Sequence, residues 1–157
     1  MIMLKWLWLS GAVVVLDQIT KLWVSGTMRL YESIDLLPFF QLTYVHNEGA
    51  AFSFLSDAGG WQRWFFIVLS SVAVIGITIW LARLPKMARW QAMSLALILG
   101  GALGNLIDRA AYGYVIDFLD AFYNDWHWPA FNVADSAITV GVAVMLIDSF
   151  FEQRNNA

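Results

Sequence analysis

The sequence predicts an all-α membrane protein with a small β element, in which four transmembrane helices are connected by an outward-facing β-hairpin and an outward loop. The chain is 60% hydrophobic and only 13% charged, which is typical of integral membrane proteins. Four apolar runs are long enough to cross a bilayer, at about residues 6–24, 64–84, 91–108 and 135–151. Between the first two runs, apolar and polar residues alternate as in a β-strand. We therefore expect one integral-membrane domain over residues 1–157.

Charge and composition exclude several kinds of protein. The formal net charge of −3 gives no reason to expect a nucleic-acid partner. The chain has no cysteine, which excludes disulfides, thiol nucleophiles and cysteine metal sites. It has only two histidines, and no grouping of residues indicates a metal ion or a cofactor. We expect neither.

The first apolar run, about residues 6–24, is expected to be a retained transmembrane helix. A signal peptide is the competing interpretation, but the run is long and no small-residue cleavage pattern follows it. Its polar residues include Asp17 and Lys21, which are four positions apart and so share a helix face. They form either a local ion pair at the membrane edge or a support for a functional site.

The segment at about residues 35–57 is predicted to form a β-hairpin on the outer side. Residues 39–45 and 51–55 alternate between apolar and polar side chains, and residues 46–49 between them include a glycine. Alternation around a turn favours a hairpin that lies on the membrane surface or covers a site. A plain loop is the alternative.

The remaining runs complete the set of four helices. In the run at 91–108, Gly100 and Gly104 have the GxxxG spacing that allows another helix to approach closely. Tryptophans fall near the predicted helix ends, as interfacial indoles do. With four helices, the positive-inside tendency places both termini in the cytoplasm and the hairpin outside, because one side collects Lys5, Arg83, Lys86, Arg89 and Arg154.

Polar residues gather at the outer end of the third helix and in the outward loop at about residues 110–131. Asn105, Asp108 and Arg109 are spaced to lie on one helix face. Arg109 is expected to pair with a carboxylate, Asp108 being the nearest, and a structural cap and ion pair is an adequate explanation for both. In the loop, Asp120 and Asp125 are expected to face solvent.

Two aspartates at the membrane edge are the candidate catalytic residues. Asp117 is flanked by apolar residues, and Asp135 opens the last helix, where it also fits the role of an N-cap. Apolar surroundings and a helix N-terminus shift carboxyl pKa values in opposite directions. If the two meet, they share one proton, as in aspartic proteases, and the pair can activate water and polarise a peptide carbonyl.

Two other classes of function remain open on these residues alone. A proton-coupled transporter or channel subunit would use its buried charges as a relay, but here the acids gather at one face of the membrane. A purely structural assembly protein would use the GxxxG spacing for helix pairing, and it would tolerate Asp→Asn changes at positions 117 and 135.

Five motifs, taken together, resemble the lipoprotein signal peptidase, or signal peptidase II, family. They occur in the family's order and cover nearly the whole chain; they are DQITK (17–21), NEGAAFS (47–53), GGALGNLIDR (100–109), VIDF (115–118) and FNVADS (131–136). The resemblance implies an aspartyl endopeptidase of the bacterial inner membrane, with four transmembrane helices, a small β-cradle and an extracellular loop.

The resemblance also implies a substrate and a set of site residues. The substrate would be a prolipoprotein, whose signal peptide is removed just before a lipid-modified, diacylglyceryl cysteine. Membrane lipids would surround the protein, and cyclic-peptide antibiotics of the globomycin type would inhibit it. Asp117 and Asp135 would be the catalytic pair, on the periplasmic face. The residues that would support the site or bind substrate are Asp17, Lys21, Asn47, Gly104, Asn105, Asp108, Arg109, Asn132 and Ala134.

Overall fold

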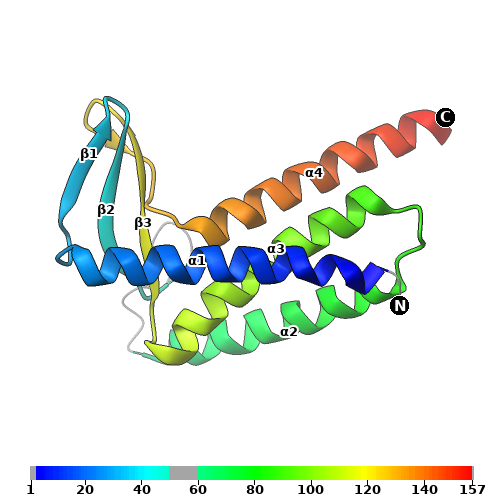
Figure 1. Ribbon diagram of the computed structural model, residues 1–157, viewed down its shortest axis with the longest axis horizontal. Coiled ribbons are helices and arrows are strands. Elements are labelled where there is room, and N and C mark those ends of the chain that lie inside the picture. The colour runs from blue at the N-terminus through cyan, green and yellow to red at the C-terminus, as the bar shows by residue number, and fades with distance from the viewer. Residues whose placement is uncertain (1–2, 50–59, 157) are drawn as a thin grey trace.

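The computed structural model describes residues 3–49 and 60–156. In this part of the chain the four predicted helices are present as α1 (Leu7–Thr27), α2 (Trp61–Arg83), α3 (Arg89–Ala111) and α4 (Val133–Asn156), and a short 3-10 helix, η1 (Met3–Trp6), precedes α1. All four are long and apolar enough to cross a membrane. They extend away from a small sheet, and both chain ends lie at the end far from the sheet (Figure 1).

Helix α3 is the centre of the bundle, because it packs against α1, α2 and α4. Its glycines permit this close contact. A Cβ added at Gly100 would lie 2.7 Å from the Val13 Cβ of α1, and one added at Gly101 would collide with the Ala134 carbonyl of α4. The close approach that the GxxxG spacing predicts is therefore present, and α3 has room for helices on opposite sides.

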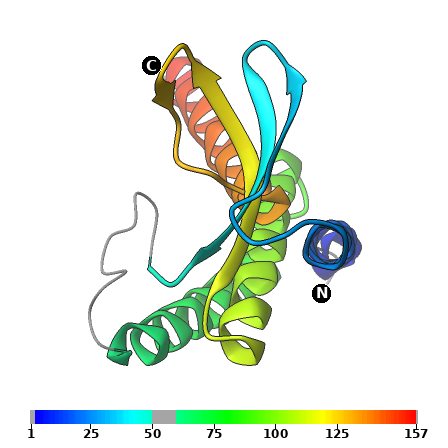
Figure 2. The same cartoon turned by 90° about the vertical axis from the view of Figure 1, so that its left-hand side faces the viewer.

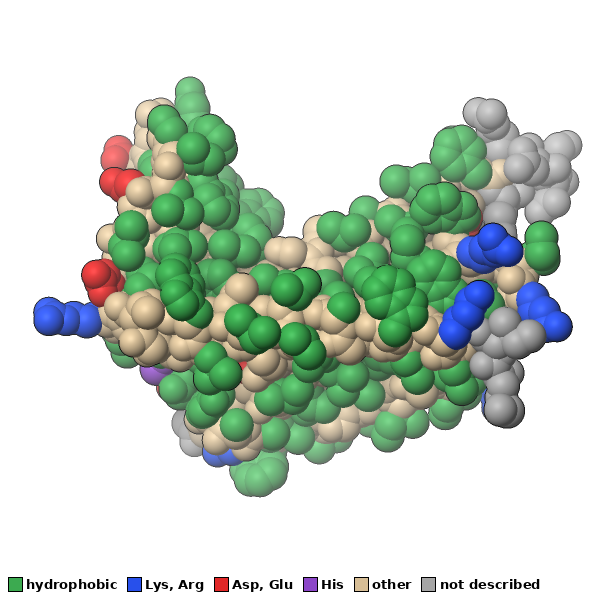
Figure 3. Space-filling model, in the orientation of Figure 1, with side chains coloured by type: hydrophobic (Ala, Val, Ile, Leu, Met, Phe, Trp, Pro, Cys, Tyr) green, Lys and Arg blue, Asp and Glu red, His purple; other side chains and the backbone are tan. Residues whose placement is uncertain are grey.

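The outer faces of the helices are apolar. On α2, Val68, Val72 and Ile75 are each about 60% exposed, and hydrophobic side chains cover most of the bundle surface in Figure 3. Such a large continuous apolar surface is costly in water and is matched by the hydrocarbon of a bilayer.

The β element is a four-stranded antiparallel sheet with the order β1-β2-β3-β4, formed by β1 (Ser33–Leu37), β2 (Phe40–Asn47), β3 (Val115–Tyr123) and β4 (Trp126–His127). The sheet lies at the end of the bundle opposite the two chain ends, with α1 to one side (Figure 2). One face of the sheet packs on the end of α1, through a cluster formed by Val24, Met28, Leu42, Tyr44, Ile116 and Phe118. This packing holds β3 against the bundle.

The predicted hairpin was wrong in its turn and in its partner strand. Strand β2 continues through His46 to Asn47, where the sequence pattern indicated a turn, and it pairs with the preceding β1 and with the distant β3. The predicted second strand, at residues 51–55, lies outside the described residues. Local alternation identified β2 but could not identify its partners, because β3 is about 70 residues further along the chain.

The outward segment 110–131 is not a plain loop, because it contains β3 and β4. The expectation that Asp120 faces solvent was also wrong. Its side chain is buried between strands, where it accepts hydrogen bonds from Gln41 and Thr43 and contacts His127 Nδ1 at 3.0 Å. Asp125 is exposed, as expected.

Each helix extends beyond its predicted range at one end or both, because tertiary contacts stabilise the additional turns. Arg63, in the first turn of α2, donates hydrogen bonds to the carbonyls of Arg109 and Ala110 at 3.1 and 2.8 Å. These are among the last carbonyls of α3, which have no partner within the helix. The C-terminal end of α3 is therefore fixed to α2.

Candidate active site

Asp117 lies in β3, with its side chain directed at the bundle. Its two neighbours, Ile116 and Phe118, point to the opposite face of the strand and into the apolar cluster, so alternation turns the acid toward α4. The side chain is only 2% exposed. Its Oδ1 accepts a hydrogen bond from Asn132 Nδ2 at 2.6 Å, and its Oδ2 accepts one from Asn47 Nδ2 at 2.9 Å.

Burial raises the pKa of Asp117 to about 7, and the nearby Asp135 carboxylate adds to the increase. The hydrogen bonds from Asn47 and Asn132 act in the opposite direction, because they favour the charged form. The carboxyl group therefore exchanges its proton near neutral pH, as a general acid or base requires.

Asp135 lies in the first turn of α4, but it is not the N-cap that its position in the sequence suggested. Helix α4 begins at Val133, so Asn132 is the cap. Asn132 Oδ1 accepts a hydrogen bond from the Asp135 backbone N–H at 2.9 Å, and Asp135 Oδ2 accepts one from the Asn132 N–H at 3.3 Å. This reciprocal arrangement is a capping box, and it fixes the direction of the Asp135 carboxylate.

Two asparagines connect the aspartates. Asn105, from α3, donates to Asp135 Oδ1 at 2.8 Å, and Asn132 donates both to Asp117 and to Asn105 Oδ1, the latter at 3.2 Å. The connection therefore runs from Asp117 through Asn132 and Asn105 to Asp135. Because the bridging groups are neutral amides, they orient the carboxyls without fixing the charge of either.

A buried ion cluster lies behind this connection. The Lys21 ammonium of α1 contacts Asp17 Oδ2 at 2.8 Å and Asp108 Oδ2 at 2.9 Å, and it donates to Asn105 Oδ1 at 3.0 Å. All three charged side chains are 0–1% exposed. The ion pair expected between Asp17 and Lys21 is therefore present, while their role as support for a functional site stays a prediction.

Each carboxylate of the cluster also accepts a hydrogen bond from the backbone N–H of the residue that precedes a candidate catalytic aspartate. Asp108 Oδ2 accepts the N–H of Ile116 at 3.1 Å, and Asp17 Oδ1 accepts the N–H of Ala134 at 2.9 Å. Ile116 and Ala134 directly precede Asp117 and Asp135. The cluster therefore determines where β3 and α4 place the two aspartates.

Gly104 and Ala134 are small because this region has no free space. A Cβ at Gly104 would lie 2.5 Å from Asp17 Oδ2 and 3.3 Å from the Ala134 Cβ. The Ala134 side chain is completely buried. A larger residue at either position would separate α3 from α1 or α4.

The expected pairing of Arg109 with Asp108 was wrong. Asp108 points toward Lys21, and within residues 3–49 and 60–156 Arg109 forms no ion pair. Its Nη2 donates to the Gly49 carbonyl at 3.0 Å, its guanidinium lies over the Phe66 ring at 5.1 Å, and its buried Nε has no partner among the described residues. The guanidinium group lines the same cavity as the aspartates.

Both aspartates line a cavity of about 610 Å³ between α4 and the sheet. Figure 3 shows the surface hollowed between these two parts of the molecule. Besides the aspartates, the cavity is lined by polar side chains that include Ser136 and Thr139 and by the apolar side chains of Trp128, Phe131, Ile138 and Val140. The sequence reasoning missed these wall residues, although the spacing of Ile138 from Asp135 could have indicated a shared helix face.

Gln18 is another residue near the site that the sequence did not single out. Its side-chain amide donates to Asp108 Oδ1 at 2.9 Å and so completes the partners of that carboxylate.

The described residues include no group of three His, Cys, Asp or Glu side chains placed to hold a metal ion. What the site offers is a pair of carboxyls, one of them with a pKa near neutral, beside an apolar cavity at the end of a membrane-spanning bundle.

The chain is similar to known proteins over nearly its whole length. The family model described as signal peptidase (SPase) II matches residues 9–151. A protein named lipoprotein signal peptidase from Alteromonas mediterranea is 55% identical over 94% of this chain and 81% of its own length. One with the same name from Shewanella halifaxensis is 52% identical over 94% and 86%.

Solved structures also match the fold. One, described as a bacterial membrane enzyme structure at 2.3 Å resolution, has a TM-score of 0.88 at 30% identity and covers 98% of this chain and 92% of that chain. A second bacterial membrane enzyme structure, at 1.9 Å resolution, has a TM-score of 0.80 at 31% identity, with coverage of 92% and 91%.

Proposed function

This chain belongs to the signal peptidase II family, and on that premise we propose that it is an aspartyl endopeptidase with Asp117 and Asp135 as its catalytic pair. It removes the signal peptide of a prolipoprotein by cleaving before the diacylglyceryl cysteine. The observation that supports the pair most strongly is that a buried carboxyl from β3 and a half-buried one from α4 line one cavity and are joined through Asn132 and Asn105.

In the proposed reaction the pair holds one proton. The ionised carboxylate takes a proton from a water molecule, whose oxygen attacks the scissile carbonyl carbon. The protonated carboxyl donates its proton to the carbonyl oxygen, which gives a neutral tetrahedral intermediate. As the C–N bond breaks, the leaving nitrogen takes a proton from one carboxyl, and a hydroxyl of the intermediate returns a proton to the other, so the pair again holds one proton. The products are a signal peptide with a free carboxyl end and a lipoprotein with a free amino-terminal cysteine.

The shape of the cavity suits a substrate that lies in the bilayer. Its apolar wall runs along α4 from Asp135 toward Ile138 and Val140, so a hydrophobic peptide or acyl chain can enter from the membrane while the carboxyls stay at the polar end. Arg109 is placed to bind substrate backbone carbonyls. Cyclic peptides of the globomycin type would compete for the same space.

The chain is a multi-pass membrane protein of the bacterial type, on the basis of its family and its four spanning-length helices. We propose the inner membrane as its location, with both termini cytoplasmic and the cavity facing the periplasm. Support comes from the exposed cations, since Lys5, Arg83, Lys86 and Arg89 all lie at the end far from the sheet.

The test is cleavage of a lipid-modified prolipoprotein by the purified protein in detergent, with a chelator present. Asp117→Asn and Asp135→Asn should each reduce kcat by about a thousandfold or more, because the proton transfers are lost. Asp125→Asn is the matched control, since Asp125 is an exposed aspartate on the same side of the protein. Cleavage that survives either substitution in a folded protein would remove that residue from the mechanism.

A further inference from the structure

The end of the bundle far from the sheet carries a cluster of cations that the proposed reaction does not use. Lys5, Arg83, Lys86 and Arg89, here called the basic cluster, are all exposed. Within the described residues none of them forms an ion pair or a side-chain hydrogen bond. Asp148, a described acid of α4, is not paired with any of them. Figure 3 shows the blue side chains gathered at this end.

Packing brings the basic cluster together from separate parts of the chain. Lys5 belongs to η1, whereas Arg83 ends α2 and Arg89 begins α3. The 3-10 helix η1 contacts α2 and α3. An apolar core of Met3, Leu81, Ala92 and Leu95, all at most 3% exposed, fixes these three segments to one another. The segments that carry Lys5, Arg83 and Arg89 are therefore packed against one another, and Lys86 lies in the short connection between α2 and α3.

The first turn of α3 makes this end of the molecule still more positive. Its cap residue, Ala88, provides no side-chain hydrogen bond, and the first turn contains no acid. A helix N-terminus carries partial positive charge and free N–H groups, so an arginine at that position is unfavourable unless an anion is near. Arg89 stands at that position.

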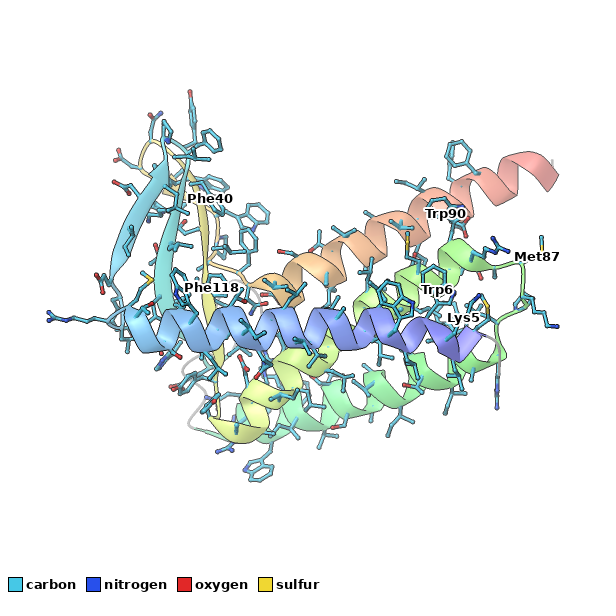
Figure 4. The ribbon with its side chains drawn as sticks, in the orientation of Figure 1. Lys5, Trp6, Phe40, Met87, Trp90 and Phe118 are labelled. Carbon is cyan, nitrogen blue, oxygen red and sulfur yellow. The ribbon has the colours of Figure 1, made fainter. Side chains whose placement is uncertain are left out.

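The surroundings indicate an anion that belongs to a membrane surface. Trp8 and Trp90 are more than 60% exposed and Met87 is 87% exposed. In Figure 4, Lys5, Trp6, Met87 and Trp90 lie together at the end opposite the labelled Phe40 and Phe118 of the sheet. Exposed indoles are typical of the headgroup level of a bilayer. In addition, the buried Trp6 indole N–H has no acceptor among the described residues.

We propose that the basic cluster is a binding site for the phosphate headgroup of an anionic phospholipid. The helices end at the level of the headgroups, where an anionic lipid is present at high local concentration. Each juxtamembrane cation strengthens such binding about fivefold. The site is independent of the proposed peptidase activity, because the basic cluster and the cavity lie at opposite ends of the helices.

The test is native mass spectrometry of the purified protein in neutral detergent, with phosphatidylglycerol and phosphatidylcholine that have identical acyl chains. The wild type should retain phosphatidylglycerol at least tenfold more tightly. Arg83→Gln/Arg89→Gln should weaken this retention about 25-fold, whereas Arg83→Lys/Arg89→Lys should keep it. Arg29→Gln is the control, because Arg29 is an exposed cation near the sheet and its substitution should change nothing.

Several outcomes would overturn the proposal. They are equal retention of the two lipids, unchanged retention in the Gln double variant, and an equal loss in the Arg29 variant. If inorganic phosphate displaces the lipid more strongly than sodium chloride of equal ionic strength, the site is one for free phosphate. Circular dichroism and prolipoprotein cleavage, both expected to be unchanged in the double variant, show that a loss of lipid is not a loss of folding.

Discussion

Two pairs of aspartates both contact Asn105 or its neighbours on α3, and they differ in what surrounds them. Asp17 and Asp108 share the Lys21 ammonium, which lies 2.8 and 2.9 Å from them and neutralises part of their negative charge. Asp117 and Asp135 instead receive hydrogen bonds from asparagine amides, and they line an open cavity. The first arrangement fixes charge and geometry, whereas the second fixes geometry alone and leaves the protonation free to change.

The comparison explains how one small bundle can contain both pairs of aspartates. The ion cluster is a structural part that anchors the N–H groups of Ile116 and Ala134. The aspartate pair lies next to those anchors, and among the described residues it forms no ion pair, although Arg109 lines the same cavity. The substitutions below test whether the two clusters have these separate tasks.

The largest effect is expected when the cation of the ion cluster is removed. Lys21→Met leaves Asp17 and Asp108 buried without their counter-charge, which should lower the free energy of unfolding by about 3–5 kcal/mol. Thermal unfolding in neutral detergent measures this, and Lys86→Met, an exposed and unpaired lysine, is the control. A Lys21→Met protein with unchanged stability would show that the cluster does not hold the fold.

A substitution in the aspartate pair should have the opposite effect on stability. The pKa of Asp117 rises on folding from 3.8 to about 7. The folded state therefore binds more protons than the unfolded chain between these values. The stabilising contribution of this group is complete below about pH 4 and is lost as the pH rises to about 7.

Asp117→Asn removes that pH dependence, because an amide does not titrate. At pH 8 the variant should be more stable than the wild type by about 2–4 kcal/mol, while its peptidase activity is lost. Near pH 4 the two proteins should be equally stable. Thermal unfolding at both pH values checks this, and a variant that is less stable at pH 8 would contradict it.

A smaller effect is expected where the ion cluster meets the helix packing. Gly104→Ala places a Cβ 2.5 Å from Asp17 Oδ2, so α1 and α3 must separate. Overpacking of this kind costs about 1–3 kcal/mol of stability. Gly76→Ala is the control, because a Cβ at Gly76 of α2 meets nothing within 4 Å. Equal effects of the two substitutions would contradict the predicted close contact.

The smallest effect is a shift in the pH dependence of catalysis. Asn47 donates to Asp117 Oδ2 and lowers its pKa, so Asn47→Ala should raise that pKa and move the corresponding limb of the kcat profile to higher pH, by about one unit. The limb should move while KM changes little. A shift toward lower pH would show that the amide does not act on the charged carboxylate.

The four helices could be predicted from the sequence because their signal is local. A run of apolar residues must be helical inside a bilayer, since every backbone polar group needs an internal partner. Asp117 and Asp135 could also be selected from the sequence as candidate catalytic residues, because burying an acid among apolar residues costs free energy and the chain has few acids in such surroundings. Which strands pair with each other could not be predicted, since strand pairing depends on segments far apart in the chain, such as Val45 opposite Asp117.

The partners of the charged residues were harder to predict than the residues themselves. Sequence spacing connected Arg109 with its neighbour Asp108, but successive residues on a helix are about 100° apart, so they point in different directions. Asp108 turns to Lys21 on α1, and Arg109 turns to the cavity. Likewise, only the position at which α4 begins shows that Asn132 is its cap.

The contact between Asp17 and Ala134 has a consequence for how the protein is made. The two residues are 117 positions apart, so the carboxylate in the first helix receives the Ala134 N–H only after almost the whole chain has been synthesised. A nascent chain that stops before α4 contains neither Asp135 nor the amides that Asn132 provides. If Asp117 and Asp135 are the catalytic pair proposed above, newly made protein stays inactive until its last helix is in place, and the insertion that completes the fold also brings the proposed pair together.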